Sequence, residues 1–139
     1  MTTGAEFSWS IRVYYEDTDS GGVVYYANYL KFMERARSEW LRSLGFEQDR
    51  LLQQEGIVFA VRRVAIDFRH PARFNDSLLV NSRIKQLRKA SLTFHQQIVR
   101  KGDRKLLVSG DVQVACIAQQ SFRPVSIPPI MLSRIPDVV

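Results

Sequence analysis

Residues Tyr14–Arg37 read YYEDTDSGGVVYYANYLKFMERAR, and this stretch joins a loop to the beginning of a helix. Its first half holds two aspartates, Asp17 and Asp19, followed by the paired glycines Gly21 and Gly22. A short cluster of aspartate, serine and glycine is typical of loops. The second half is rich in apolar and long side chains and contains no glycine or proline. The stretch therefore predicts a loop that leads directly into a helix.

The predicted helix runs from Tyr29 to Leu44, where apolar residues recur at the spacing of one helix face. Asn28 suits the N-cap position, and Gly45 suits the position just past the last turn. Charged residues fall on the opposite face. We therefore expect an amphipathic helix about 24 Å long that buries one side.

Alternating apolar and polar residues on both sides of this segment predict strands. Their predicted ranges are 8–15, 59–68, 78–87, 92–98 and 106–118. A phase slip at Arg62 and Arg63 predicts a β-bulge, and Lys101–Asp103 is typical of a hairpin turn. One short helical turn is expected at 49–54, between the long helix and the second strand.

The order of these elements predicts an α+β fold in which an antiparallel sheet of about five strands wraps around one long central helix. We expect a single domain over residues 1–139, with terminal arms at about 1–7 and 129–139. Pro124, Pro128 and Pro129 favour an extended arm over a helix in the tail. An uncovered edge strand and sheet face favour association with further copies.

The chain has 139 residues, one cysteine, two histidines and a formal net charge of +6. Its length and apolar content support a folded core, which excludes intrinsic disorder and a disulfide-stapled mini-protein. Its cysteine and histidines are a poor zinc set, and no apolar run has the length of a membrane span. Residues 1–9 lack the features of a secretory signal, so we expect a cytoplasmic protein. The positive charge favours an anionic partner such as a phosphorylated ligand, a nucleic acid or a membrane surface.

Two interpretations fit the carboxylates of the loop. A carboxylate beside the free N–H groups and the positive dipole end of a helix could act as nucleophile or general base. The same N–H groups would then hold a developing oxyanion, and the glycines would allow a ligand to approach the backbone. Alternatively, an aspartate in a turn ahead of a helix is commonly an Asx-turn or capping residue. Composition and spacing leave both interpretations open.

A further set of residues extends the pattern over most of the chain. The matching positions are Arg12–Asp19, Gly22–Tyr25, Tyr29, Glu34–Arg37, Arg62, Pro71–Arg73, Arg88 and Ser91–Leu92. On these residues the chain resembles the hotdog-fold acyl-CoA thioesterases of the 4-hydroxybenzoyl-CoA thioesterase-like family. Within that family it is most similar to the YbgC type, which is associated with the Tol–Pal system. The resemblance implies hydrolysis of acyl-CoA without a metal or other cofactor. It also implies a homotetramer built from dimers with sites at subunit interfaces, and a Tol–Pal or peripheral membrane link.

The resemblance also assigns roles to individual positions. Asp19 matches the catalytic aspartate, as nucleophile or general base, and the backbone N–H of Tyr26 matches the donor that polarises the thioester carbonyl. Members of the YbgC type usually carry histidine where this chain has Tyr26, which bears on the class of acyl group. Arg88 and Lys89 match the region that holds the nucleotide end of the coenzyme. The complete set of substrate-binding positions implied in this way is Gly22, Val24, Arg62, Arg88, Lys89 and Ser91.

Three other functions are alternatives to the hydrolysis of acyl-CoA, and the sequence argues against two of them. A non-catalytic module of the same fold would bind acyl-CoA or an acyl carrier without turnover. A hotdog hydratase needs a histidine soon after the aspartate, and none occurs before His70. Lysine and arginine are spread along the chain rather than clustered with aromatic residues, so no nucleic-acid partner is expected. Cys116 and His95, on predicted strands, are interpreted as an inert core thiol and a surface or interface residue.

Overall fold

The computed structural model describes residues 6–135 of the chain. The elements follow in the order β1 (Phe7–Arg12), η1 (Tyr15–Asp17), α1 (Asn28–Ser43), α2 (Gln48–Glu55), β2 (Ile57–Phe68), β3 (Ser77–Leu87), β4 (Ser91–Arg100), β5 (Leu106–Ala118) and α3 (Pro129–Arg134). Residues 1–5 and 136–139, which belong to the predicted terminal arms, lie outside the described residues.

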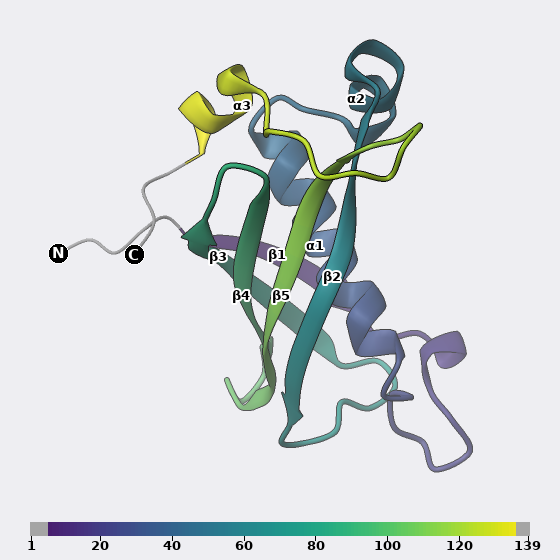
Figure 1. The fold of residues 1–139 in the computed structure, drawn as a ribbon. Helices are drawn as coiled ribbons and strands as arrows, with labels where there is room; N and C mark the ends of the chain where they lie inside the picture. The colour runs from purple at the N-terminus through teal and green to yellow at the C-terminus, as the bar shows by residue number, and fades with distance from the viewer. Residues whose placement is uncertain (1–5, 136–139) are drawn as a thin grey trace, which may run out of the picture.

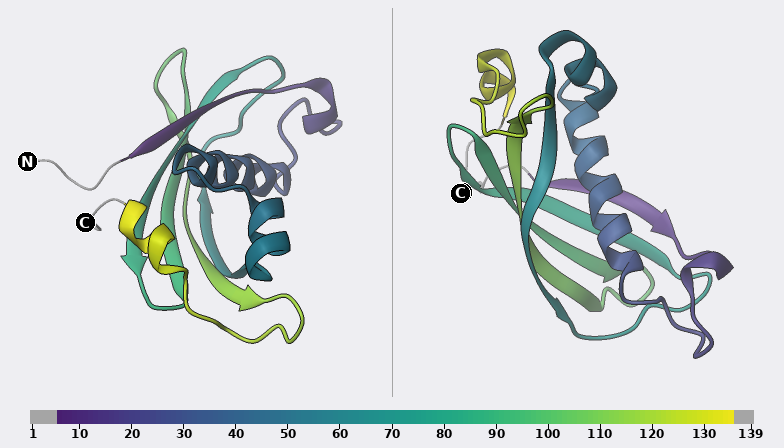
Figure 2. Two further views of the ribbon diagram at one scale, coloured as in Figure 1. Left: turned by 90° about the horizontal axis from the view of Figure 1, so that it is seen from above. Right: turned by 45° about the vertical axis from the view of Figure 1, so that its right-hand side comes forward.

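The five strands form one antiparallel sheet in the order β1-β3-β4-β5-β2. The sheet curves around α1, which crosses its concave side (Figures 1 and 2). The predicted arrangement of about five antiparallel strands around one long helix is therefore confirmed. The bulge is confirmed too, because the register of β2 against β5 shifts between Val61 and Arg63. Within residues 6–135, no helix is long and apolar enough to cross a membrane.

The core lies between α1 and the concave face of the sheet. Along β3 and β4 every second residue is buried, as the alternating pattern predicts. The helix meets this face with a stripe of six buried residues, which are Tyr29, Phe32, Met33, Ala36, Trp40 and Leu41. Complete burial of one large aromatic side chain stabilises the fold by roughly 1.5–3 kcal/mol. The position of α1 over the sheet is therefore strongly specified.

The first strand and the start of the helix differ from the prediction. β1 ends at Arg12, and the chain then turns through η1, so Tyr15 is 75% exposed and does not face the core. Asn28 is the first residue of α1 and not its N-cap, which is Ala27. The Asn28 amide Nδ2 donates to the carbonyl oxygen of Asp17 at 2.9 Å. This side chain therefore fastens the loop to the helix, a long-range role that local capping rules cannot reveal.

The tail also differs from the prediction. Residues 129–134 form α3, so the expectation of an extended arm is wrong for them. Proline is compatible with the first turn of a helix, where its missing N–H is not needed, and Pro129 occupies that position. Ile127, Met131 and Ile135 are buried in a second core cluster, which also contains Trp40 and Leu41 of α1. Apolar burial of the tail thus decides its structure.

Candidate active site

The loop between η1 and α1 is closed by its own backbone. The N–H of Asp19 donates to the carbonyl oxygen of Val23 at 2.9 Å, and the N–H of Gly22 donates to the carbonyl oxygen of Asp19 at 3.0 Å. Gly22 has a φ angle of 79°, in the left-handed region that favours glycine. A side chain at this position would strain the turn. The loop therefore has a defined shape that fixes where Asp19 stands.

The two carboxylates of the loop have different surroundings. Asp17 Oδ2 accepts the backbone N–H of Tyr14 at 2.8 Å, while its carbonyl oxygen accepts the N–H of Tyr25 at 3.0 Å. Asp17 is therefore committed to holding the loop together. Asp19 is exposed, and its Oδ1 accepts the N–H of Gly21 at 2.9 Å. Its Oδ2, like Oδ1 of the half-buried Asp17, accepts no hydrogen bond from residues 6–135, so the two carboxylates differ in their exposure.

The backbone at the start of α1 offers a donor beside this loop. The N–H of Asn28 donates to the carbonyl oxygen of Tyr25 at 2.8 Å, and that of Tyr29 to the carbonyl oxygen of Tyr26 at 3.3 Å. The N–H groups of Tyr26 and Ala27 have no acceptor among the described residues. The first N–H groups of a helix carry partial positive charge. An acyl oxygen placed here would therefore be polarised.

Aromatic rings surround that donor. The Tyr26 ring lies 4.9 Å from the Tyr25 ring and 6.2 Å, edge to face, from Phe68 at the end of β2. The pKa of the Tyr25 phenol is raised, first by its hydrogen bond with the Tyr26 phenol and also by the negative charge of Asp19. The site therefore combines an exposed carboxylate, two backbone amides without an acceptor and a wall of aromatic rings.

Tyr29 holds the neighbouring 69–76 loop against this junction, a role beyond the core position that the sequence suggested. Its hydroxyl accepts the N–H of Ala72 at 2.9 Å, and the carbonyl oxygen of Ala72 accepts the N–H of Val24 at 2.9 Å. Burial is the largest cause of the raised pKa of the Tyr29 phenol. Because the phenol stays protonated, its oxygen acts as a neutral acceptor. The Val24 side chain is 4% exposed and belongs to the core on which the loop rests.

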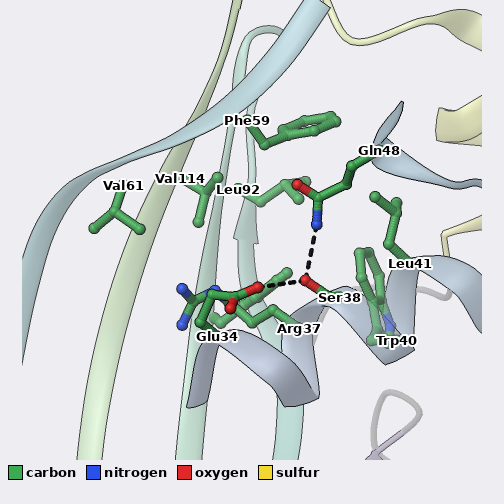
Figure 3. A pocket seen from close by; sticks show the side chains of 11 residues that line it. Glu34, Arg37, Ser38, Trp40, Leu41, Gln48, Phe59, Val61, Leu92 and Val114 are labelled. Carbon is green, nitrogen blue, oxygen red and sulfur yellow. Dashed lines mark hydrogen bonds between the residues drawn. The ribbon is translucent and has the colours of Figure 1, made fainter. Parts of the chain in front are cut away.

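Three hollows follow one another along the side of α1 that faces β2, and we call them together the α1 trough. The first, about 260 Å³, lies at the helix start beside Tyr26 and Phe68. The second, about 350 Å³, is lined by Leu30 and Val64 among others. The third, about 90 Å³, lies between α1, α2 and the sheet beside Trp40 (Figure 3). The trough is largely apolar and begins beside Tyr26.

Arg37 lines both the second and the third hollow, as do Glu34 and Val61. In the sequence Arg37 was only one position of the matched motif. Its Nη1 donates to Gln96 Oε1 at 3.0 Å. Burial lowers the pKa of Arg37 to about 10, which still leaves the guanidinium protonated near neutral pH. The largely apolar trough therefore contains a charged guanidinium that a hydrogen bond holds in place.

The remaining predicted binding residues do not gather at this junction within one chain. Gly22 and Val24 belong to the loop. Arg62 is exposed at the bulge of β2, which is an edge strand. Arg88 and Lys89 are exposed in the turn between β3 and β4, and Ser91, which follows them, is 8% exposed. That turn lies at the opposite end of the sheet from the loop (Figure 1). The eleven residues of β3 separate the two ends by about 35 Å.

Two residues that were not predicted to be catalytic, Cys116 and His95, lie in surroundings that fit a structural role. Cys116 is fully buried, and burial raises the pKa of its thiol to about 11, so the reactive thiolate is scarce at neutral pH. His95 Nδ1 lies 2.8 Å from Asp111 Oδ1 on the outer sheet face, where Lys85 Nζ donates to Asp111 Oδ2 at 2.6 Å. Neither residue belongs to the loop–helix junction.

A curved antiparallel sheet around one helix, with a carboxylate loop at the helix start, defines a hotdog thioesterase. The chain belongs to the thioesterase superfamily, whose family model matches residues 21–107. Among its relatives is the acyl-CoA thioesterase YbgC of Haemophilus influenzae, which is 43% identical over 122 residues, covering 88% of both chains. The predicted membership of this family is confirmed.

Solved structures carry the same fold. A probable thioesterase from Bartonella henselae is 38% identical with a TM-score of 0.84, covering 89% of this chain and all of that one. A 1,4-dihydroxy-2-naphthoyl-CoA thioesterase from Synechocystis is 27% identical with a TM-score of 0.88, covering 94% of this chain and 96% of that one. The predicted hotdog fold is therefore confirmed.

Proposed function

We propose that this chain hydrolyses the thioester bond of acyl-CoA to a free acid and coenzyme A, with Asp19 as its catalytic carboxylate. The observation that carries the proposal is the difference between the two loop carboxylates. Each keeps one carboxylate oxygen that accepts no hydrogen bond among residues 6–135, but Asp17 is half-buried and its carbonyl oxygen binds Tyr25 and Asn28, whereas Asp19 is exposed. Relatives named acyl-CoA thioesterase support the choice of substrate.

The reaction follows from Asp19 and the backbone N–H of Tyr26. The Tyr26 N–H donates to the carbonyl oxygen of the thioester and stabilises the negative charge that develops on it, an effect of about 3–4 kcal/mol for one such donor. Asp19 either removes a proton from the attacking water or attacks the carbonyl carbon itself. The carbon–sulfur bond then breaks, and the thiolate of coenzyme A takes up a proton. When Asp19 is the nucleophile, water cleaves the resulting anhydride in a second step.

We also propose that the active unit contains two copies paired along β2. This strand is twelve residues long and lies at the edge of the sheet. Val61, Val64 and Phe68 on it remain 49%, 41% and 50% exposed. A long edge strand with exposed apolar side chains is a template for pairing with another strand. Antiparallel pairing of two β2 strands would continue the sheet and cover these residues.

Such pairing supports a role for the β3–β4 turn in binding the coenzyme. In one chain Arg88 lies about 35 Å from the end of the sheet that carries the loop. A two-fold axis through the β2 edges reverses the second copy, so its turn comes to the loop end of the first. Arg88 and Lys89 of the second copy would then face the phosphates of a coenzyme whose thioester lies at Asp19. Arg62, at the bulge of the edge strand, would lie close to this boundary.

The alternative of a binding module without turnover is tested by the same assay as the proposed activity. Purified protein should release coenzyme A, detected as free thiol, from at least one member of a panel from acetyl-CoA to palmitoyl-CoA and 4-hydroxybenzoyl-CoA. Binding of the panel without release of thiol would contradict hydrolysis and favour the module. The pairing of dimers into a tetramer, a cytoplasmic location and a Tol–Pal or membrane link stay predictions of the family resemblance.

A further inference from the structure

The α1 trough has an internal division. Its first hollow lies beside Tyr26 and Tyr29, and its second lies further along α1, beside Leu30. Its third hollow is the smallest and lies beyond Arg37, next to Trp40 and Phe94. Arg37 lines both the second and the third hollow, together with Glu34 and Val61. Any chain that extends from the Tyr26 amide into the last hollow must therefore pass the Arg37 side chain.

Arg37 is held in place from the sheet side. Its acceptor, Gln96, is fully buried on β4. Gln96 Nε2 donates to the carbonyl oxygen of Met33 at 3.0 Å and to Ser82 Oγ at 2.9 Å. The acceptor is thus fixed by both the helix and β3. A guanidinium that bonds to such a rigid partner stays at this point of the trough.

The charge of Arg37 is only partly compensated. Its one hydrogen bond to a side chain goes to the neutral amide of Gln96, and it forms no ion pair among residues 6–135. Glu34, one turn earlier, forms no ion pair with Arg37, although its negative charge favours the charged guanidinium. The Glu34 carboxylate accepts the hydroxyl of Ser38, which in turn accepts Gln48 Nε2 (Figure 3). The remaining N–H groups of the guanidinium therefore depend on water. An alkyl chain that displaces this water leaves a charged donor without an acceptor, which is costly.

The distance from the amide to this cation is set by the helix. Tyr26 and Arg37 are eleven positions apart, about 16 Å along the axis. Side chains on a helix lean toward its N-terminus by about one turn, so the guanidinium lies about 11 Å from the amide. With C–C bonds near 1.5 Å, an extended acyl chain spans that distance with about eight carbons.

We propose that Arg37, fixed by Gln96, determines substrate specificity by limiting the acyl group to about eight carbons. This inference rests on the proposed hydrolysis of acyl-CoA. Acyl groups up to octanoyl fit within the first two hollows without reaching the guanidinium. Dodecanoyl and palmitoyl groups meet the cation and bind poorly. Arg37 is a residue that selects the substrate and takes no part in the chemical step.

The test compares chain-length profiles of three variants with that of the wild type. Arg37→Met removes the charge and keeps most of the volume, Arg37→Gln removes the charge with a shorter side chain, and Arg35→Met is the matched control on an exposed position of the same helix. For each protein, kcat and KM are measured from butanoyl-CoA to palmitoyl-CoA, and thermal unfolding confirms that it is folded.

For the wild type we expect kcat/KM to fall by about tenfold or more between octanoyl-CoA and dodecanoyl-CoA. Either Arg37 variant should raise the dodecanoyl-to-butanoyl ratio of kcat/KM by about tenfold, mainly through a lower KM for the long chain. Arg35→Met should reproduce the wild-type profile. Equal use of octanoyl and palmitoyl groups by the wild type would overturn the proposal, as would a profile that keeps its shape in a folded Arg37 variant.

Failure of the proposed hydrolysis would have a different signature. A wild type that releases no thiol from any chain length contradicts the proposed function. In that case, the role of Arg37 is tested by calorimetry, which measures the binding of the same acyl-CoA series to the wild type and to the Arg37 variants. Loss of length dependence in the variants supports the proposal, and parallel profiles reject it.

Discussion

Replacement of Asp19 by asparagine should lower kcat for acyl-CoA hydrolysis by about 1,000-fold. The loop should keep its shape, because the asparagine amide oxygen can still accept the N–H of Gly21. What is lost is the negative charge that activates water or attacks the carbonyl carbon. Acyl-CoA should therefore still bind, and calorimetry should give a dissociation constant within a few-fold of the wild type. Steady-state release of thiol measures the loss.

The matched control for this change is Asp17→Asn, two residues away in the same loop. Asp17 uses its carboxylate to accept the N–H of Tyr14, a bond that asparagine can also accept. This variant should lose less than about tenfold in kcat, with any effect arising through the position of the loop. Equal losses in the two variants, or a fully active Asp19→Asn protein, would remove Asp19 from the chemistry.

Replacement of Phe32 by alanine should destabilise the fold by about 3–5 kcal/mol. Phe32 is completely buried on α1, and its ring meets that of Tyr29 edge to face at 6.1 Å. The cavity left by its removal lies at the centre of the helix–sheet contact. Since domains are commonly stable by only about 5–15 kcal/mol, this variant should lose much of its stability. Urea unfolding at a fixed protein concentration gives the difference.

Leu52→Ala is the comparison for this measurement. Leu52 lies on α2 and is 39% exposed, so its removal leaves no buried cavity. Its free energy of unfolding should stay within about 1 kcal/mol of the wild type. A Phe32→Ala protein as stable as the Leu52→Ala protein would contradict the position assigned to α1 over the sheet.

The sequence predicted the fold well wherever periodicity is carried by burial. The strands near residues 78–87 and 92–98 and the long helix have one apolar face each, and the alternation or helical spacing of those faces is visible without a structure. The predictions failed where a contact between residues far apart in the sequence determines the local structure. Asn28 forms a hydrogen bond with Asp17 instead of capping its helix, and Met131 is buried in a tail whose prolines predicted an extended arm.

The candidate site was predictable only in part. The residues of the loop pointed to a carboxylate beside a helix start, but their composition could not separate Asp17 from Asp19. The separation depends on how far each carboxylate is exposed, which is a property of the folded loop. Arg37 was not predictable as a functional residue, because its partner Gln96 lies 59 positions away. Nor does the sequence reveal that the Arg88 turn and the Asp19 loop occupy opposite ends of the sheet.

The central claim is that one site uses Asp19 of one copy and the Arg88 turn of another, and mixed dimers of Asp19→Asn and Arg88→Ala chains test it most directly. The two chains are coexpressed with different tags, purified through both, and assayed for thiol release below the KM of the wild type. Dimers of Asp19→Asn alone should be inactive, and dimers of Arg88→Ala alone should show a raised KM. Each mixed dimer holds one intact site of two, so it should recover about half of the wild-type kcat/KM. Activity equal to the mean of the two parent dimers would contradict a shared site.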